Sequence, residues 1–262
     1  MNEPRENPEQ VAILPRDLVE GLAKGLRVIE AFDDLHPTLT ATACGRRCGI
    51  TRTAARRHLL TLVHLGYAGT DGKSFWLAPR VMRLGESYLE AARLPRLVQP
   101  FIQQLSVTTG ETVNFSVLDG HEVLYLGRST SPRVVSVGFE RGARAPAHVV
   151  APGVVLLTKL DDAQLAQWVQ AHAFTSFTPR TIADPQQFAA QVKAARDTGW
   201  WMTAQQLDAS FTGLATAVFD RRGALRGAIG MTFPSAVWDT DRVQARLLPP
   251  LLVTAASLRA VV

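Results

Sequence analysis

Hydrophobic residues recur at helical spacing in the first part of the chain. Leu22, Leu26, Ile29 and Phe32 follow one another at intervals of three or four residues, which predicts a helix over residues 18–32. Thr40 or Thr42 can cap a short second helix over 40–48, and Gly49 supplies the turn residue after it. Thr51 can cap a third helix over 51–64, whose buried face would consist of Ala55, Leu59, Leu62 and Val63.

Two short extended segments, 67–70 and 74–77, follow the third helix. Between them lies Asp71-Gly72, a dipeptide that favours a tight β-hairpin. Three helices followed by a hairpin are typical of a winged helix-turn-helix, a module that binds DNA.

A helical connector is expected next. Pro79 begins it, and Pro95 interrupts it before a further helix over 97–108. Its apolar stripe would either join two copies of the chain or cover the winged domain. The predicted organisation is a flexible leader over 1–17, a winged helix-turn-helix over 18–79, and a helical linker with a second domain over 80–262. The residues of the stripe are Val81, Leu84, Tyr88 and Leu89.

The pattern changes to alternating strands after Glu111. Hairpins are expected at Asp119-Gly120 and across 220–223, with another strand over 134–139. The last helix, from about Asp241, is expected to kink at Pro249-Pro250. The second domain is therefore predicted to have an α+β fold, with other helices over 151–160, 162–172 and 185–198.

Basic charge is concentrated in the winged helix-turn-helix. Residues 40–73 contain six basic residues and one acid, an excess equal to the net charge of the whole chain, +5. The third helix would be about 21 Å long at about 1.5 Å per residue, which suits a major groove. The predicted DNA contacts are Thr40, Thr42, Thr51, Arg52, Thr53, Arg56 and Arg57 on the helices and Lys73 at the hairpin tip.

Six runs of residues resemble the IclR family of bacterial transcriptional regulators. Residues 22–32, 51–67 and 79–85 are similar to its first helix, recognition helix and linker helix. The second domain carries similar runs at 145–148, 177–182 and 197–200, so that the resemblance spans residues 18–258. The run Thr178-Pro-Arg-Thr-Ile182 resembles the branch that regulates catabolism of protocatechuate, para-hydroxybenzoate and β-ketoadipate.

This resemblance implies a GAF-like α/β effector-binding domain with a pocket on one face of its sheet. The effector would be a small organic acid, aromatic by analogy with the branch, and Arg144 or Arg180 could supply a cation for its carboxylate. Departures from the family at Pro152-Gly153, Gln205-Gln206 and Phe211-Thr212 make the pocket tighter and less polar. The pocket residues that the resemblance implies are Ala145, Ala151, Pro152, Gly153, Thr203, Phe211, Gly213, Gly230 and Thr232.

Two other function classes stay open: a small-molecule sensor or scaffold without DNA binding, and an enzyme that uses the pocket. The basic third helix argues against the first, and the lack of a nucleophile with a neighbouring base argues against the second. Cys44 and Cys48 lack the histidine pair of a zinc site, so no metal or other cofactor is expected. His148 is expected to be structural.

The expected partners are a double-stranded DNA operator and further copies of the chain. One helix reads few base pairs, so useful specificity needs two half-sites and hence a homodimer or a tetramer. No apolar run is long enough to span a membrane, and the polar N-terminus is not a signal peptide, so a cytoplasmic protein is expected. The sequence leaves open the effector, the operator, and whether the protein activates or represses.

Overall fold

The chain forms two compact units, residues 1–92 and 93–262. Their structure is a computed structural model that describes residues 14–91, 93–130 and 139–262. The units divide at the end of the connector helix α4 (Met82–Ala91), whereas the sequence analysis placed the boundary near residue 80, at the start of that helix. Most of the predicted leader and most of the strand expected over 134–139 lie outside the described residues.

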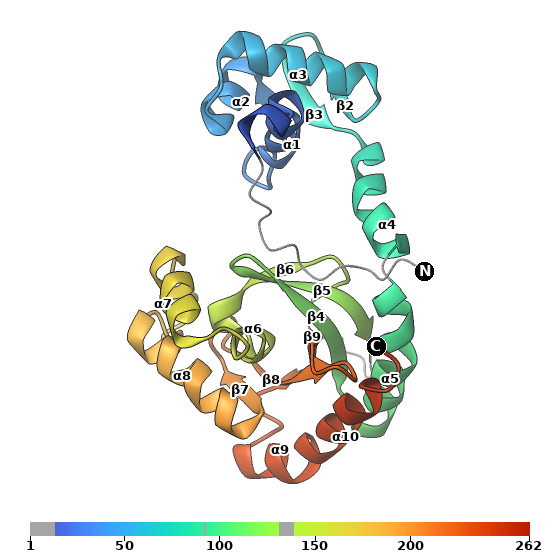
Figure 1. The fold of residues 1–262 in the computed structure, drawn as a ribbon, viewed down its shortest axis with the longest axis vertical. Coiled ribbons are helices and arrows are strands. Elements are labelled where there is room, and N and C mark those ends of the chain that lie inside the picture. Colours follow the sequence, from blue (N-terminus) through green and yellow to red (C-terminus); the bar gives the residue numbers. More distant parts are fainter. Residues whose placement is uncertain (1–13, 92, 131–138) are drawn as a thin grey trace. The chain divides into compact units, whose positions relative to one another are not determined.

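Three helices and a small sheet precede the connector helix α4 in the N-terminal unit (Figure 1). The helices are α1 (Glu20–Glu30), α2 (Ala41–Cys48) and α3 (Arg52–His64), preceded by a 3-10 turn over Pro15–Asp17. Both predicted caps are confirmed, because the hydroxyl oxygens of Thr40 and Thr51 each accept a hydrogen bond, at 3.2 Å, from the amide three residues later. Gly49 adopts a left-handed φ of 65° after α2, as its place in the sequence predicts.

The hairpin of the N-terminal unit is the wing. Its strands β2 (Ala68–Thr70) and β3 (Ser74–Leu77) are antiparallel, and β1 (Leu39–Thr40), which the sequence analysis did not predict, pairs with the other edge of β3. The Asp71 carboxylate accepts hydrogen bonds from the amides of Lys73 and Ser74 at 2.9 and 2.6 Å. A short polar side chain thus closes the turn that Asp71-Gly72 predicted.

The helix predicted from the spacing of Leu22, Leu26, Ile29 and Phe32 is confirmed as α1, but these residues differ in burial. Leu22 and Leu26 are 63% and 46% exposed, whereas Ile29 and Phe32 pack against the core of the unit. The fully buried residues are Val28 and Ala31, in one cluster with the α2 and α3 residues Cys44, Ala55 and Leu59. Several apolar positions compete, and only packing decides which of them is buried.

A six-stranded antiparallel sheet forms the C-terminal unit, in the order β6-β5-β4-β9-β8-β7. The predicted hairpins are confirmed as β4 (Thr112–Asp119) with β5 (Glu122–Ser129), and β8 (Phe211–Phe219) with β9 (Leu225–Pro234). The sequence analysis described no element for the two edge strands, β6 (Arg144–Pro146) and β7 (Trp200–Ala204).

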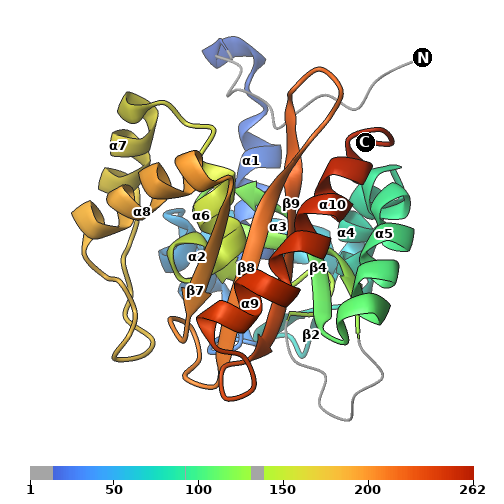
Figure 2. The same ribbon diagram turned by 90° about the horizontal axis from the view of Figure 1, so that it is seen from below.

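Helices cover both faces of this curled sheet. The long helices α5 (Arg93–Thr109) and α10 (Leu248–Leu258) pack together against one face, with α9 (Thr240–Arg246) leading into α10 (Figure 2). The short helix α6 (Ala151–Leu157) lies in the hollow of the other face, flanked by α8 (Pro185–Thr198) and α7 (Asp162–Ala171) (Figure 1). Every residue of α6 is buried.

Prolines lie in the first turns of α5 and α10. Pro95 was expected to interrupt the connector, but α5 begins at Arg93 and continues through this residue to Thr109. Pro249-Pro250 follows Leu248 at the start of α10. A proline is tolerated there because the first amides of a helix have no intrahelical acceptor. The predicted kink in the last helix is therefore a boundary between two helices.

Candidate DNA-binding surface and effector pocket

The exposed face of α3 carries the predicted DNA contacts. Thr51, Arg52, Thr53, Arg56 and Arg57 are all exposed at its first two turns. Within the described part of the chain, no salt bridge engages the three arginines. Their guanidinium groups can therefore face phosphates or guanine edges, and this role stays a prediction.

The remaining predicted contacts differ in accessibility. Thr42 and Lys73 are exposed, with Lys73 at the tip of the wing, whereas Thr40 is half-buried and its hydroxyl caps α2. Arg47 belongs to the same basic stretch but serves the fold: its Nε donates to the Ala31 carbonyl at 2.8 Å and its guanidinium pairs with Asp33. Basic residues counted along the sequence thus include one that holds α1 and α2 together.

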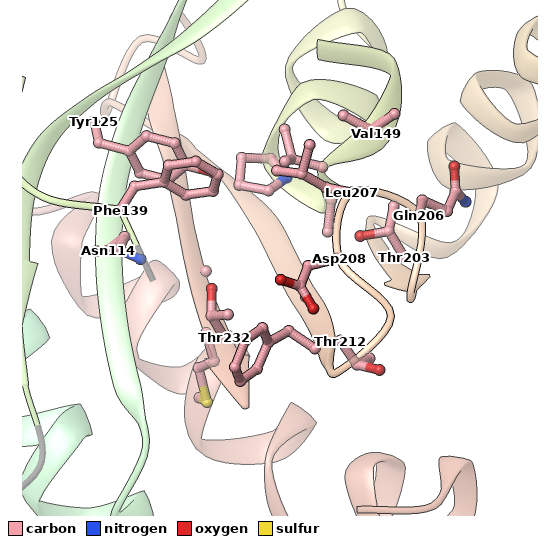
Figure 3. A pocket seen from close by; sticks show the side chains of 17 residues that line it. Asn114, Tyr125, Phe139, Val149, Thr203, Gln206, Leu207, Asp208, Thr212 and Thr232 are labelled. Carbon is pink, nitrogen blue, oxygen red and sulfur yellow. The ribbon is translucent and has the colours of Figure 1, made fainter. Parts of the chain in front are cut away.

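A cavity of about 320 Å³ lies between the start of α6 and one face of the sheet. This volume lies at the lower end of the usual range for small-molecule sites. Its walls come from β4, β5, β7, β8, β9, the segment before α6 and the loop between β7 and β8 (Figure 3). The lining residues are Asn114, Tyr125, Phe139, Val149, Val150, Ala151, Pro152, Thr203, Gln206, Leu207, Asp208, Phe211, Thr212, Gly213, Gly230, Met231 and Thr232.

Seven of the nine predicted pocket residues line this cavity, and Ala145 and Gly153 do not. Ala145 lies on β6, paired with Val123 and packed in the core. Gly153 lies in the first turn of α6 against the Ala147 backbone, where an added Cβ would stand 2.0 Å from the carbonyl oxygen. Its amide donates to the Val150 carbonyl at 3.0 Å.

Neither of the two predicted cations lines the cavity. Arg144 is exposed on β6 and forms salt bridges with Asp119 and Glu122. Arg180 is exposed in the loop before α8. Among the described residues that line the cavity there is no lysine, arginine or histidine, and Asp208 is their one carboxylate. A bound carboxylate would depend on neutral hydrogen-bond donors from these residues.

The aromatic and amide end of the cavity was not predicted from the sequence. Tyr125 and Phe139 stack with ring centroids 4.4 Å apart and an interplanar angle of 15° (Figure 3). Burial raises the pKa of the Tyr125 phenol well above its ordinary value, so that it stays neutral. Asn114 lies beside this pair on β4. An asparagine inside an apolar strand was an available signal, but the sequence analysis gave it no role.

The Thr178-Pro-Arg-Thr-Ile182 run holds the loop that closes one side of the cavity. The Thr178 hydroxyl donates to the Gln205 carbonyl, and the Thr181 hydroxyl donates to the Gln206 carbonyl, both at 2.6 Å. Gln205 has a left-handed φ of 57°, and the next residues, Gln206 to Asp208, line the cavity. The run therefore acts on the pocket indirectly, by fixing the backbone of this loop.

Cys44, Cys48 and His148 have surroundings that are typical of residues that support the fold. The Cys44 and Cys48 sulfurs are 3.9 Å apart, and burial, together with Cys48, raises the pKa of Cys44 to about 12. His148 is buried and has a polar partner on each ring nitrogen. The Nε2 of His148 lies 3.0 Å from the Thr175 carbonyl oxygen, and the Nδ1 of His148 lies 2.7 Å from the Nε2 of His172. No cluster of three or more metal-ligating side chains is found in residues 14–91, 93–130 and 139–262.

A membrane-spanning helix is not found among the described residues, since none of their helices combines the necessary length and apolar character.

Two family domains match the chain. Residues 21–72 match the IclR helix-turn-helix domain, and residues 86–260 match the bacterial transcriptional regulator IclR C-terminal domain. Over 257 residues the chain is 37% identical to the p-hydroxybenzoate hydroxylase transcriptional activator of Acinetobacter baylyi, an alignment that covers 94% of this chain and 93% of the activator.

Solved structures share the fold. A transcriptional regulator from Rhodococcus sp. RHA1 is 35% identical with a TM-score of 0.74, covering 92% of this chain and 97% of its own. The inducer-binding domain of the PobR transcription factor from Acinetobacter, a double mutant in complex with 3-hydroxybenzoic acid, is 30% identical with a TM-score of 0.62. That match covers 65% of this chain and the whole of the domain, 100%. The chain therefore belongs to the IclR family of bacterial transcriptional regulators, with a helix-turn-helix DNA-binding domain followed by the curled-sheet C-terminal domain of that family.

Proposed function

We propose that this regulator controls genes for the catabolism of aromatic acids, and that a hydroxybenzoate-type acid bound in the cavity is its effector. The observation that carries the proposal is the cavity itself, which is narrow, mostly apolar and enclosed by aromatic side chains. The relatives support the same ligand class. One is the p-hydroxybenzoate hydroxylase transcriptional activator at 37% identity, and the other is an inducer-binding domain in complex with 3-hydroxybenzoic acid at 30% identity.

Small residues shape the sheet side of the cavity. An added Cβ would stand 3.6 Å from the Ala151 Cβ at Gly213 and 3.5 Å from the Pro152 ring at Gly230, so α6 lies close to the sheet at these glycines. A ligand ring therefore has to lie beside these contacts. There the aromatic side chains of the cavity, Tyr125, Phe139 and Phe211, offer stacking or edge-on contacts.

The effector acts on DNA binding through its differential affinity for two states of the protein. The operator is double-stranded DNA, and the active species is a homodimer or a tetramer, because a 13-residue recognition helix contacts few base pairs. We place the protein in the cytoplasm, where a bacterial regulator meets its operator. The family and its relatives are transcriptional regulators, which favours this function over an enzyme or a scaffold.

Thermal unfolding of the purified full chain tests the ligand class. The screen contains 3-hydroxybenzoate, 4-hydroxybenzoate, protocatechuate and the aliphatic acid β-ketoadipate. A true effector at about 100 times its Kd stabilises the folded protein by about 2.7 kcal/mol and raises its Tm by several degrees. If β-ketoadipate shifts the Tm at millimolar concentration and no aromatic acid does, the proposed ligand class is wrong and only the regulator assignment stands.

A further inference from the structure

Residues 175–181, between α7 and α8, form hydrogen bonds with two different walls of the cavity; we call them the bridging segment. On one side the segment contacts His148, which directly precedes the lining residues at the start of α6. On the other side it contacts the loop 205–210 between β7 and β8, whose residues 206–208 line the cavity. No residue of the bridging segment is itself among the described lining residues.

Two hydroxyl groups join the bridging segment to the loop 205–210. The Thr181 Oγ1 accepts hydrogen bonds from two amides of the segment, at 3.0 and 2.9 Å, which occupy its lone pairs. Its single proton is therefore left for the Gln206 carbonyl. In the same way the Thr178 hydroxyl accepts from a third amide of the segment, at 3.1 Å, and donates to the Gln205 carbonyl. Both donors are thus oriented toward the loop before any ligand binds.

The loop 205–210 depends on this support. Gln205 has a left-handed φ of 57°, which a residue with a Cβ keeps only where its surroundings enforce it. Its amide continues the β7–β8 ladder by donating to the Phe211 carbonyl at 2.9 Å, but the carbonyls of Gln205 and Gln206 accept from the bridging segment. Without these two bonds the loop loses contacts that oppose its opening.

His148 joins the bridging segment to the other wall. The Thr175 carbonyl can only accept, so the Nε2 of His148, 3.0 Å away, carries a hydrogen and donates it. The Nδ1 of His148 then accepts from the Nε2 of His172 at 2.7 Å. His148 is buried, so the loss of either bond would leave a polar atom without a partner. The bridging segment therefore holds both walls of the cavity.

We propose that Thr178 and Thr181 are positioning residues for the effector: their hydroxyl protons hold the loop 205–210 in place at the side of the cavity and so slow the release of the bound acid. This inference rests on the proposed function and deepens it, since it assigns affinity to side chains outside the cavity. Enclosure matters here because the described lining contains no cation, and a loop that is already in place lowers the cost of ordering the site on binding.

The test measures binding kinetics on the full chain, with whichever of 3- and 4-hydroxybenzoate the wild type binds more tightly. Thr178→Val with Thr181→Val keeps the shape of both side chains and removes both donors. Because two neutral hydrogen bonds are lost, we expect the acid to bind about 10-fold or more weakly, mainly through faster dissociation. Thr178→Ser with Thr181→Ser keeps both hydroxyls and should bind within a factor of about three of the wild type.

Hydrogen exchange separates positioning from overall stability. In the empty double valine variant the amides of 206–208 should exchange faster than in the wild type, while the paired amides of β8 and β9 keep their rates. Thr254→Val is the matched control for a lost hydroxyl. Thr254 donates to the Pro250 carbonyl at 2.8 Å on α10, which packs on the opposite face of the sheet from α6. This variant should bind the acid like the wild type.

Several results would overturn the inference. If the double valine variant binds the acid within a factor of about three of the wild type, the bridging segment does not set the affinity. If the double serine variant binds as weakly as the double valine variant, the hydroxyl donors are not the cause. Equally faster exchange in β8 and β9 would assign the two threonines to overall stability instead. A wild-type chain that binds neither acid contradicts the proposed function itself, before any variant is measured.

Discussion

The two units of this regulator place their functional residues in opposite ways. In the N-terminal unit the candidate DNA contacts, apart from the half-buried Thr40, are exposed, and they are close in sequence, on the start of α2, the first turns of α3 and the hairpin tip. In the C-terminal unit the candidate effector contacts are mostly buried and come from strands and loops between Asn114 and Thr232. A surface that meets a long polyanion needs charge along one element, whereas a pocket for a small molecule needs enclosure, which several elements must share.

The largest expected effect is on operator binding by the N-terminal unit. Replacing Arg52, Arg56 and Arg57 together by Ala should weaken operator binding by at least about 100-fold, since one guanine-reading arginine alone is worth about 1–3 kcal/mol. Fluorescence anisotropy over a range of salt concentrations measures it, and the salt dependence should become less steep.

The control for this variant removes exposed arginines from the other unit. Arg141→Ala with Arg180→Ala lowers the net charge without touching α3. Operator affinity equal to wild type in the triple variant would mean that the arginines of α3 do not contact the operator. An equal loss in the control would mean that they contribute only general charge.

The second prediction closes the pocket without disturbing the winged domain. In Gly213→Val the added Cβ would stand 3.6 Å from the Ala151 Cβ, an ordinary contact, and 3.3 Å from the Thr203 hydroxyl, so that the Thr203 side chain must shift by a few tenths of an ångström. The side chain then fills the space over the sheet. We expect the Tm shift with hydroxybenzoate to disappear, while the Tm of the empty protein changes by a few degrees at most.

Ala163→Val, an exposed position on α7, is the matched control for added volume. Operator binding without effector should stay close to the wild-type value in Gly213→Val. An undiminished ligand shift in this variant would place the effector outside the cavity.

The smallest expected effect is a loss of stability at low pH that is caused by His148 and His172. Burial, with the neighbouring His148 and His121, lowers the pKa of His172 to about 4, and burial lowers the pKa of His148. In the unfolded chain these histidines bind protons near pH 6.5, whereas in the folded chain they bind protons only at lower pH. Stability from these groups is therefore complete above about pH 6.5 and is lost as the pH falls toward 4.

Thermal unfolding between pH 7.5 and 4.5 measures this loss. His172→Phe keeps a ring on Trp168, which stacks on His172 at 4.4 Å, and should flatten the Tm profile by a few degrees at the acid end. His64→Phe, at an exposed position on α3, should leave the profile unchanged. Parallel profiles for wild type and His172→Phe would show that His172 titrates alike in both states.

Local rules predicted the N-terminal unit well because its features are local. Thr40, Thr51, Asp71 and Gly49 act on residues two to four positions away, so their roles follow from sequence spacing alone. The face of α1 did not follow, because Leu22 and Val28 are equally apolar and only the position of α2 and α3 decides which is buried. In the sequence Arg47 looks like its basic neighbours. Only the tertiary structure shows that it serves the fold, because its Nε donates to the Ala31 carbonyl.

In the C-terminal unit the sequence by itself determined less. It predicted the hairpins β4–β5 and β8–β9, the helices and the family, but not the edge strands β6 and β7. The tertiary structure alone decided that Gly153 packs against Ala147 and not against a ligand, that Arg144 pairs with Asp119 and Glu122, and that Asn114, Tyr125 and Asp208 share one cavity. The physical reason is that a cavity is the space between elements distant in sequence, and it depends on how they pack rather than on any one of them.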